Sequence, residues 1–202
     1  PLKAATIAIR GVGGQGNLFF GKVLAQVAFL AGYDDRNILK GETHGMAQMG
    51  GPVISTFGCG EVFSPALVPG TANVLIAMEK AEVLRPGFLD LLEPGGTVLM
   101  ADTRILPHGL KPEAYPSDEA IAAQLEGYRV VSVDVLSIAL NLGDPKGRCA
   151  NVAMLGVLST LPPFDVVPEA VWLQALRGIS RKPALWDLNH AAFMAGRGMQ
   201  KG

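Results

Sequence analysis

The chain has 202 residues, of which 49% are hydrophobic and only 17% are charged, and its formal net charge at pH 7 is −1. This balance excludes a basic surface for nucleic acid or acidic membranes. About a quarter of the residues of a soluble domain are usually charged, so the shortfall suggests apolar surface that a partner chain covers. We recognise no signal peptide and no apolar run of the roughly 18 residues that span a bilayer. We therefore expect a single cytoplasmic domain over residues 1–202.

An apolar run at residues 4–10 leads into a glycine-rich turn at 11–17, and a helical pattern follows from 18 to 31. This order predicts a strand, a turn and a helix, the first half of a βαβ unit. Three of the glycines have the G-x-G-x-x-G spacing, which permits a tight turn, the close approach of a ligand and close packing of helix on strand. The N-terminus of the helix favours an anion beside it. The candidate binding residues of this turn are Gly11, Gly13, Gly14, Gln15, Gly16 and Asn17.

A dinucleotide site is one interpretation of this turn, and a purely structural turn is another. In a dinucleotide-binding fold, an acidic residue at the end of the second strand binds the ribose about 20 residues after the glycines. Asp34 and Asp35 are near that distance, but they precede only a short apolar pair and resemble a turn more than a strand end. Asn17 is equally suited to cap the N-terminus of the helix.

Residues 41–52 are rich in glycine and methionine, show no core periodicity and are interpreted as a functional loop. The segment holds Glu42, His44 and Gln48. An imidazole beside a carboxylate can titrate near neutrality and donate to a carboxylate or a cofactor. A lone histidine more often only satisfies backbone groups, and both interpretations of His44 stay open here.

A β-hairpin is expected directly after this loop. Its predicted strands are residues 53–58 and 61–65, and residues 58–60 (Gly-Cys-Gly) are the predicted turn. A plain nucleotide-binding domain has no need of such an insertion, so we expect the loop and the hairpin to carry function.

The remaining sequence alternates between strand and helix patterns. We expect strands at 73–78, 97–100 and 129–134, and helices at 81–92, 117–125, 151–161, 168–176 and 183–194. The fold class is therefore α/β, an open, mostly parallel Rossmann-like sheet with helices on both faces and a β-hairpin insertion. Glu79 and Glu82 follow a predicted strand, where ligands bind in such sheets, although both also suit the first turn of a helix. Gly156 predicts close helix packing, either within the fold or across a subunit boundary.

The chain has two cysteines, Cys59 and Cys149, and their separation matches no metal-binding spacing. We expect two reduced thiols, with a single disulfide as the alternative. A four-cysteine iron–sulfur cluster needs more thiols than these.

Several of these motifs together resemble the γ-type domain of 2-oxoacid:ferredoxin oxidoreductases. They are Gly-Val-Gly-Gly-Gln-Gly-Asn at 11–17, Glu-Thr-His-Gly-Met-Ala-Gln at 42–48 with Gly50-Gly51, Ser64-Pro65, Glu79 with 82–85, and 181–183 with Asn189 and Phe193. The resemblance covers nearly the whole chain, and the block at 42–48 is its most specific part. Within the family, the indolepyruvate enzymes are the most similar, with the pyruvate, 2-oxoglutarate and 2-oxoisovalerate enzymes as alternatives.

The resemblance implies oxidative decarboxylation of a 2-oxoacid to an acyl-CoA, with electrons passed to ferredoxin. It also implies thiamine diphosphate, magnesium and [4Fe–4S] clusters. The chain has neither four cysteines nor the usual diphosphate–magnesium motif, so we expect these cofactors on a large partner subunit and no metal here. His44 and Glu42 are the catalytic candidates, while the glycine turn and Gln48 would contact the phosphate of CoA or a partner's cofactor. The isolated chain is expected to be an inactive homodimer. An NAD(P)-binding dehydrogenase and a non-catalytic assembly module remain the alternatives.

Overall fold

A computed structural model describes residues 4–11, 14–34, 38–44, 53–60, 68–106 and 109–199. The strands and helices, with short 3-10 turns marked η, are β1 (Ala4–Arg10), α1 (Gly14–Leu30), β2 (Ile38–His44), β3 (Val53–Gly60), β4 (Ala72–Ala77), η2 (Lys80–Leu84), η3 (Leu89–Leu91), β5 (Leu92–Ala101), η4 (Pro112–Ala114), α2 (Asp118–Gln124), β6 (Arg129–Val133), α3 (Val135–Asn141), α4 (Ala150–Leu158), η5 (Phe164–Val166), α5 (Glu169–Ile179) and α6 (Pro183–Gly198). In the described part of the chain, no helix is both long enough and apolar enough to cross a membrane.

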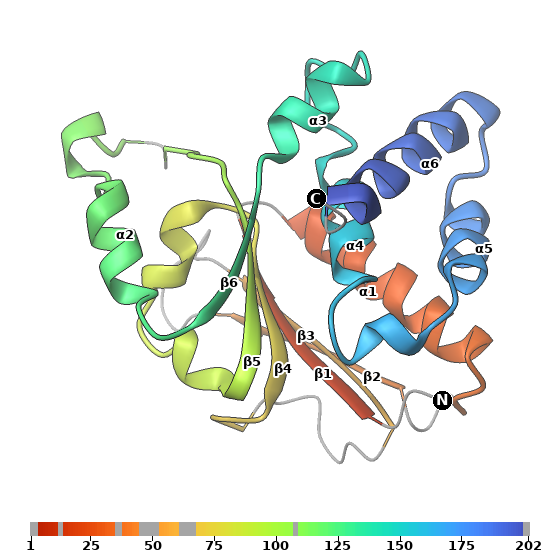
Figure 1. Cartoon of the computed structure of the whole chain (residues 1–202), viewed down its shortest axis with the longest axis horizontal. Coiled ribbons are helices and arrows are strands. Elements are labelled where there is room, and N and C mark those ends of the chain that lie inside the picture. Colours follow the sequence, from red (N-terminus) through yellow and green to blue (C-terminus); the bar gives the residue numbers. More distant parts are fainter. Residues whose placement is uncertain are drawn as a thin grey trace.

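The strands form one six-stranded sheet in the order β2-β3-β1-β4-β5-β6. Strands β1, β4, β5 and β6 are parallel to one another, whereas β3 runs antiparallel to both β1 and β2. Helices α1, α4, α5 and α6 lie on one side of the sheet, and α2 lies on the other (Figure 1). The predicted open, mostly parallel α/β sheet with helices on both faces is therefore confirmed.

The two faces of the sheet carry two separate cores because successive side chains of a strand point to opposite faces. Ile7 and Ile9 of β1 pack in the core beneath the large helical layer, which also contains Trp172 of α5. Ala8, between them, packs in the smaller core on the face of α2. All of these side chains are at most 1% exposed, so the central strands are buried on both sides, as their almost continuous apolar sequence requires.

Helix α1 ends at Leu30 and is closed by Gly32 two residues later. Gly32 adopts a φ of +98°, a left-handed conformation that glycine tolerates best. The N–H of Tyr33 donates to the carbonyl of Ala28, and the N–H of Gly32 donates to that of Phe29, both at 3.0 Å. This pair of bonds is a Schellman cap. At the other end, α1 already begins at Gly14, so Asn17 lies inside the helix, and the suggestion that it caps the N-terminus was wrong.

The predicted hairpin is wrong in its position. Residues 58–60 are not a turn but the end of β3, where Cys59 is buried and pairs with Ala5 of β1 on one side and Ile38 of β2 on the other. Pairing with two neighbouring strands holds Gly58 in the strand against its local preference, and Gly60 ends the strand with a φ of +88°. Strand β3 instead pairs antiparallel with β2, so residues 41–44 of the predicted loop are strand. Residues 61–65, the other predicted strand, lie outside the described residues.

The predicted helix at 81–92 was also wrong. The segment instead contains η2 and η3, separated by Pro86 and by Gly87, whose φ is +81°. Proline disfavours the helical conformation of the residue before it, and it lacks the N–H that a continuing helix needs. Strand β5 then begins at Leu92, five residues before the predicted strand at 97–100, and its register with β4 shifts between Ala72 and Val74. The parallel pairing of β4 with β5 is as predicted.

Helices α4 and α6 cross with their backbones in contact, which explains the glycine in α4. A Cβ on Gly156 would lie 2.1 Å from the carbonyl oxygen of Phe193, and a Cβ on Gly196 would lie 2.1 Å from that of Ala153. Real Cβ atoms do not approach so closely, so both glycines are required by the crossing. Of the two alternatives for Gly156, this contact shows packing within the fold.

Candidate functional site

The carboxyl ends of the parallel strands bring the predicted site residues to one edge of the sheet. Strand β2 runs in the same direction as β1 because both are antiparallel to β3. Ile54 of β3 pairs with Thr43 of β2 on one side and with Arg10 of β1 on the other. Two strand spacings, roughly 10 Å, therefore separate the backbone of Thr43 from that of Arg10. Glu42 and His44 flank Thr43, so their backbones lie at the same edge as the glycine turn.

The first glycine of the turn is required by the packing of two strand ends. A Cβ on Gly11 would lie 2.7 Å from the Cβ of Met78, which follows β4. The N–H of Met78 donates to the carbonyl of Arg10 at 2.9 Å and holds the two chain segments together. A larger residue at Gly11 would push them apart. This contact supports the structural interpretation of that glycine.

The other predicted residues of the turn are placed only in part. The backbone of α1 begins at Gly14 and carries residues 14–17 in its first turn, which contains no acidic residue. Free N–H groups at this helix end favour an anion, and the helix starts at the ligand-binding edge of the sheet. Gly13 and Gln48 lie outside the described residues, so their predicted roles stay predictions.

A buried ion pair joins β1 to the segment after β4. Nε of Arg10 donates to Oε2 of Glu82 at 2.6 Å, and the two residues are 8% and 3% exposed. Nη2 of Arg85 lies 3.8 Å from the other carboxylate oxygen. Removing either partner would leave an uncompensated charge out of water, which is costly. The pair therefore fixes the position of η2 at the end of β1.

Glu79 is the second buried carboxyl of this edge, and it is 2% exposed. It accepts hydrogen bonds from the N–H of Ala81 at 3.0 Å, from the N–H of Ile105 at 3.4 Å and from the hydroxyl of Tyr115. Burial raises the pKa of Glu79, and the nearby charge of Glu82 adds to the rise, while the backbone N–H donors oppose it. Glu79 is thus a carboxyl group with a raised pKa at the end of a central strand.

An exposed group of charges surrounds these buried residues. Nζ of Lys80 lies 2.5 Å from the carboxylate of Asp102 and 3.2 Å from that of Asp118, which also pairs with Arg104 at 2.6 Å. The guanidinium of Arg104 lies over the ring of Tyr115, 5.3 Å from its centre. These contacts tie α2 and the chain after β5 to the Glu79 segment.

Two buried hydroxyls near the edge have no hydrogen-bond partner among the described residues. They belong to Thr103, which follows β5, and to Ser55 of β3, which pairs with Glu42 of β2. Buried hydroxyls without partners are uncommon because leaving them unpaired costs free energy. Both can therefore donate to a group that binds at this edge.

Sequence reasoning identified Glu79 and Glu82 but missed the side chains that hold them. The sequence contains one signal for Arg10, whose charge lies directly at the end of an apolar strand and before the glycines. Tyr115 and Arg104 carried no such signal, since the loop that contains them reaches Glu79 only in the folded chain.

The cysteines do not fit an iron–sulfur cluster. Cys59 and Cys149 are free thiols, as predicted, and both are buried. Burial raises the pKa of each to about 11, and two cysteines are fewer than the four that ligate a cluster. Across the described residues, no group of three histidine, cysteine or acidic side chains is arranged to hold a metal.

The parallel sheet, the glycine turn that leads into α1 and the charged carboxyl edge together define a Rossmann-like α/β domain with its ligand-binding edge at the strand ends. Residues 6–199 match the pyruvate ferredoxin/flavodoxin oxidoreductase family, and the chain belongs to that family. The resemblance that its motifs indicated is thereby confirmed.

The chain is similar to known proteins over its whole length. It is 33% identical to the indolepyruvate oxidoreductase subunit IorB of Thermococcus kodakarensis over 201 residues, 96% of this chain and 95% of that subunit. The pyruvate oxidoreductase subunit PORC of Thermotoga maritima has the same fold, with a TM-score of 0.67 at 22% identity over 96% of this chain and 95% of that chain. The 2-oxoglutarate:ferredoxin oxidoreductase of Magnetococcus marinus contains this fold within a longer chain, with a TM-score of 0.70 at 20% identity over 98% of this chain and 31% of that one.

Proposed function

We propose that the chain is the small subunit of a 2-oxoacid:ferredoxin oxidoreductase that converts an aryl pyruvate, such as indolepyruvate, to its acyl-CoA. The similarity to the Thermococcus subunit carries this proposal, because it extends over nearly the full length of both chains. The name of that relative makes indolepyruvate the first substrate to test. The function is that of a single cytoplasmic domain over residues 1–202, which assembles with a larger subunit.

The larger subunit holds thiamine diphosphate, magnesium and the [4Fe–4S] clusters in this proposal. Thiamine diphosphate would supply the carbanion that decarboxylates the 2-oxoacid. The cysteine chemistry supports this division, because two buried, protonated thiols cannot ligate a four-cysteine cluster. The small subunit is inactive alone, and it self-associates when its partner is missing.

Within the assembled enzyme, the carboxyl edge of this chain faces the reaction. Glu42 and His44 are its catalytic candidates, with His44 donating to a substrate carboxylate or to a cofactor. The glycine turn with Gln15 and Asn17, together with Gln48, contacts the phosphate of CoA or of the partner's cofactor. The shared edge supports this proposal, since it brings the backbones of Thr43 and Arg10 within roughly 10 Å.

The experiment is purification of the tagged chain from its host without oxygen. We expect a large cluster-containing subunit to co-purify and the complex to reduce a viologen dye when an aryl 2-oxoacid and CoA are present. A panel of aryl and aliphatic 2-oxoacids then identifies the substrate. A chain that purifies alone and binds a nicotinamide nucleotide would instead establish the dehydrogenase alternative.

The site proposal has its own test within the active complex. His44→Asn and Glu42→Gln are each expected to lower kcat at least tenfold while the complex still forms. His190→Asn is the matched control, because its ring lies 5.2 Å from that of Trp186 on α6, far along the chain from the carboxyl edge. If kcat is unchanged in both variants while the complex still forms, Glu42 and His44 have a structural role and no catalytic one.

A further inference from the structure

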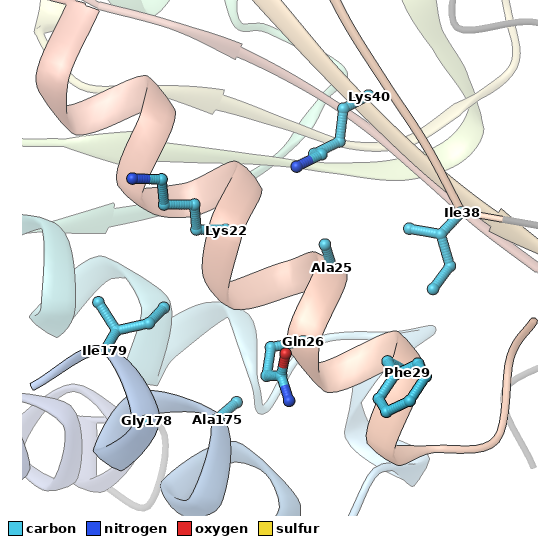
Figure 2. A pocket seen from close by; sticks show the side chains of 9 residues that line it. All are labelled: Lys22, Ala25, Gln26, Phe29, Ile38, Lys40, Ala175, Gly178 and Ile179. Atoms are coloured by element: carbon cyan, nitrogen blue, oxygen red, sulfur yellow. The ribbon is translucent and has the colours of Figure 1, made fainter. Parts of the chain in front are cut away.

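A hollow of about 690 Å³ lies away from the carboxyl edge, between α1, β2 and α5 (Figure 2). Helix α1 contributes Lys22, Gln26 and Phe29, which the helix repeat places on one side. Strand β2 contributes Ile38 and Lys40, which alternate onto the same face of the sheet. The hollow is therefore built from regular elements rather than from loops.

Several of the residues that line the hollow are small. Ala25 of α1 and Ala175 and Gly178 of α5 are small lining residues, and Ile179 adds an aliphatic wall. A Cβ on Gly178 would have no atom within 4 Å, so this helix position borders open space. Phe29, at the rim, is 54% exposed although it is a large apolar side chain. An exposed aromatic beside an apolar hollow is typical of a surface that another chain covers.

The charges of the hollow all have one sign. Lys22 and Lys40 are exposed, and none of the described lining residues is acidic. Neither lysine forms an ion pair with a described residue. The stem of Lys40 lies over α1, with its Cδ 3.6 Å from where a Cβ on Gly21 would be. An apolar centre with two ammonium groups at its rim, neither paired with a described residue, is complementary to an apolar side chain flanked by carboxylates.

We propose that this hollow is the docking site for a peptide segment of the large partner subunit. The segment places an aliphatic or aromatic side chain among the small lining residues, covers Phe29, and sets its carboxylates beside Lys22 and Lys40. This inference rests on the proposed function, which supplies the large subunit. A peptide segment fits better than a small ligand because Lys22, Gln26 and Phe29 are all exposed, and a ligand pocket normally encloses most of its occupant.

Two kinds of variant separate the apolar and the charged parts of the site. Gly178→Leu fills the hollow without a clash and at a helical position, while Gly198→Leu is its control at the end of α6, where a Cβ also meets nothing within 4 Å. Lys22→Glu with Lys40→Glu reverses the rim charge, while Lys111→Glu with Lys146→Glu changes the net charge equally at other exposed lysines. Each purified variant is first checked for wild-type circular dichroism and thermal midpoint.

Binding of each variant to the large subunit is measured without oxygen on an immobilised tagged chain. Gly178→Leu and the Lys22/Lys40 reversal are each expected to weaken the complex at least tenfold, with both controls within twofold of wild type. Wild-type affinity in both hollow variants would overturn the docking site while the proposed function stood. Failure of the wild-type chain to bind any thiamine-dependent large subunit would refute the proposed function itself.

A photo-crosslinking residue in place of Phe29 locates the occupant directly. The expected product joins this position to an acidic segment of the large subunit, identified by mass spectrometry of the assembled complex. A crosslink to a second copy of this chain, or none to the large subunit, would overturn the inference.

Discussion

The α4–α6 crossing and the carboxyl edge of the sheet are both almost free of solvent, but opposite kinds of interaction hold them together. At the crossing, Gly156 and Gly196 carry no side chain, and the helix backbones touch. At the edge, Arg10, Glu79 and Glu82 are charged or titratable side chains that are at most 8% exposed. The glycine contacts of the crossing depend on shape, whereas the buried charges of the edge depend on their partners.

This difference determines how each region responds to change. The glycine contacts of the crossing join backbone to backbone and contain no titrating group, so their contribution to stability does not depend on pH. The edge contains a buried ion pair and a carboxyl group with a raised pKa. Its contribution to stability therefore depends on charge-changing substitutions and on pH. The proposed chemistry lies at the edge, and the crossing belongs to the helical layer that covers one face of the sheet (Figure 1).

Removing one charge from the edge is expected to have the largest effect. Arg10→Met leaves Glu82 buried with only Arg85 nearby, and should lower the free energy of unfolding by about 3 kcal/mol. Replacing both partners, as Arg10→Met with Glu82→Leu, should recover most of this loss because no unpaired charge remains. Denaturant unfolding at pH 7 measures both. A double variant as unstable as the single one would show that the two residues act separately.

Adding one methyl group to the crossing tests the other region. Gly156→Ala forces the backbone of Phe193 away from α4 and should lower the free energy of unfolding by about 2 kcal/mol. Gly178→Ala is the matched control, since its Cβ enters open space in a helix and should stabilise by up to about 1 kcal/mol. Denaturant unfolding compares the two, and equal effects would mean that α4 and α6 can separate without cost.

The pH response distinguishes the edge from the crossing. Burial raises the pKa of Glu79 above its ordinary value of 4.5, so the stability that its protonated form contributes is complete below that value. This contribution is lost as the pH rises through the raised pKa, by about 1.4 kcal/mol for each unit of the shift. Glu79→Gln should flatten this decline, whereas Gly156→Ala should leave its slope unchanged. Unfolding free energies from below pH 4.5 to about pH 8 measure both, and parallel curves for wild type and Glu79→Gln would contradict the assignment.

The smallest effect is expected at two helix caps outside both regions. Asp134 accepts from the N–H of Ser137 at 3.0 Å at the start of α3, and hydrogen bonds from the hydroxyl and N–H of Ser137 lower the pKa of Asp134. Asp134→Ala should cost about 1 kcal/mol at neutral pH. The loss should vanish in acid. A carboxylate whose pKa is depressed in the folded state stabilises the fold above its ordinary pKa, and this contribution is lost as the pH falls through the folded-state pKa. Ser117→Ala removes the uncharged cap of α2 and should cost a similar amount at every pH. A loss at Asp134 that persists in acid would contradict the charge assignment.

Local patterns predicted most of the regular elements. The apolar runs gave the positions of β1, β4 and β6, and glycine, serine and proline marked the end of α1 and the starts of α2 and α6. These signals work because caps and buried strands depend on residues close in sequence. The errors fall where distant partners decide, as in β3, whose Gly-Cys-Gly end belongs to the sheet because it pairs with strands distant in sequence.

The sequence by itself determined the fold class, the family and the residue types available for chemistry, because these depend on local periodicity and on motifs that can be read directly. It also determined that this chain lacks the thiols for an iron–sulfur cluster. Only the tertiary structure decided that Tyr115 reaches Glu79, that Arg10 pairs with Glu82 across 72 positions, and that α1, β2 and α5 leave a hollow between them. Such contacts depend on how elements far apart in sequence pack together, and no local sequence pattern shows which of these elements meet.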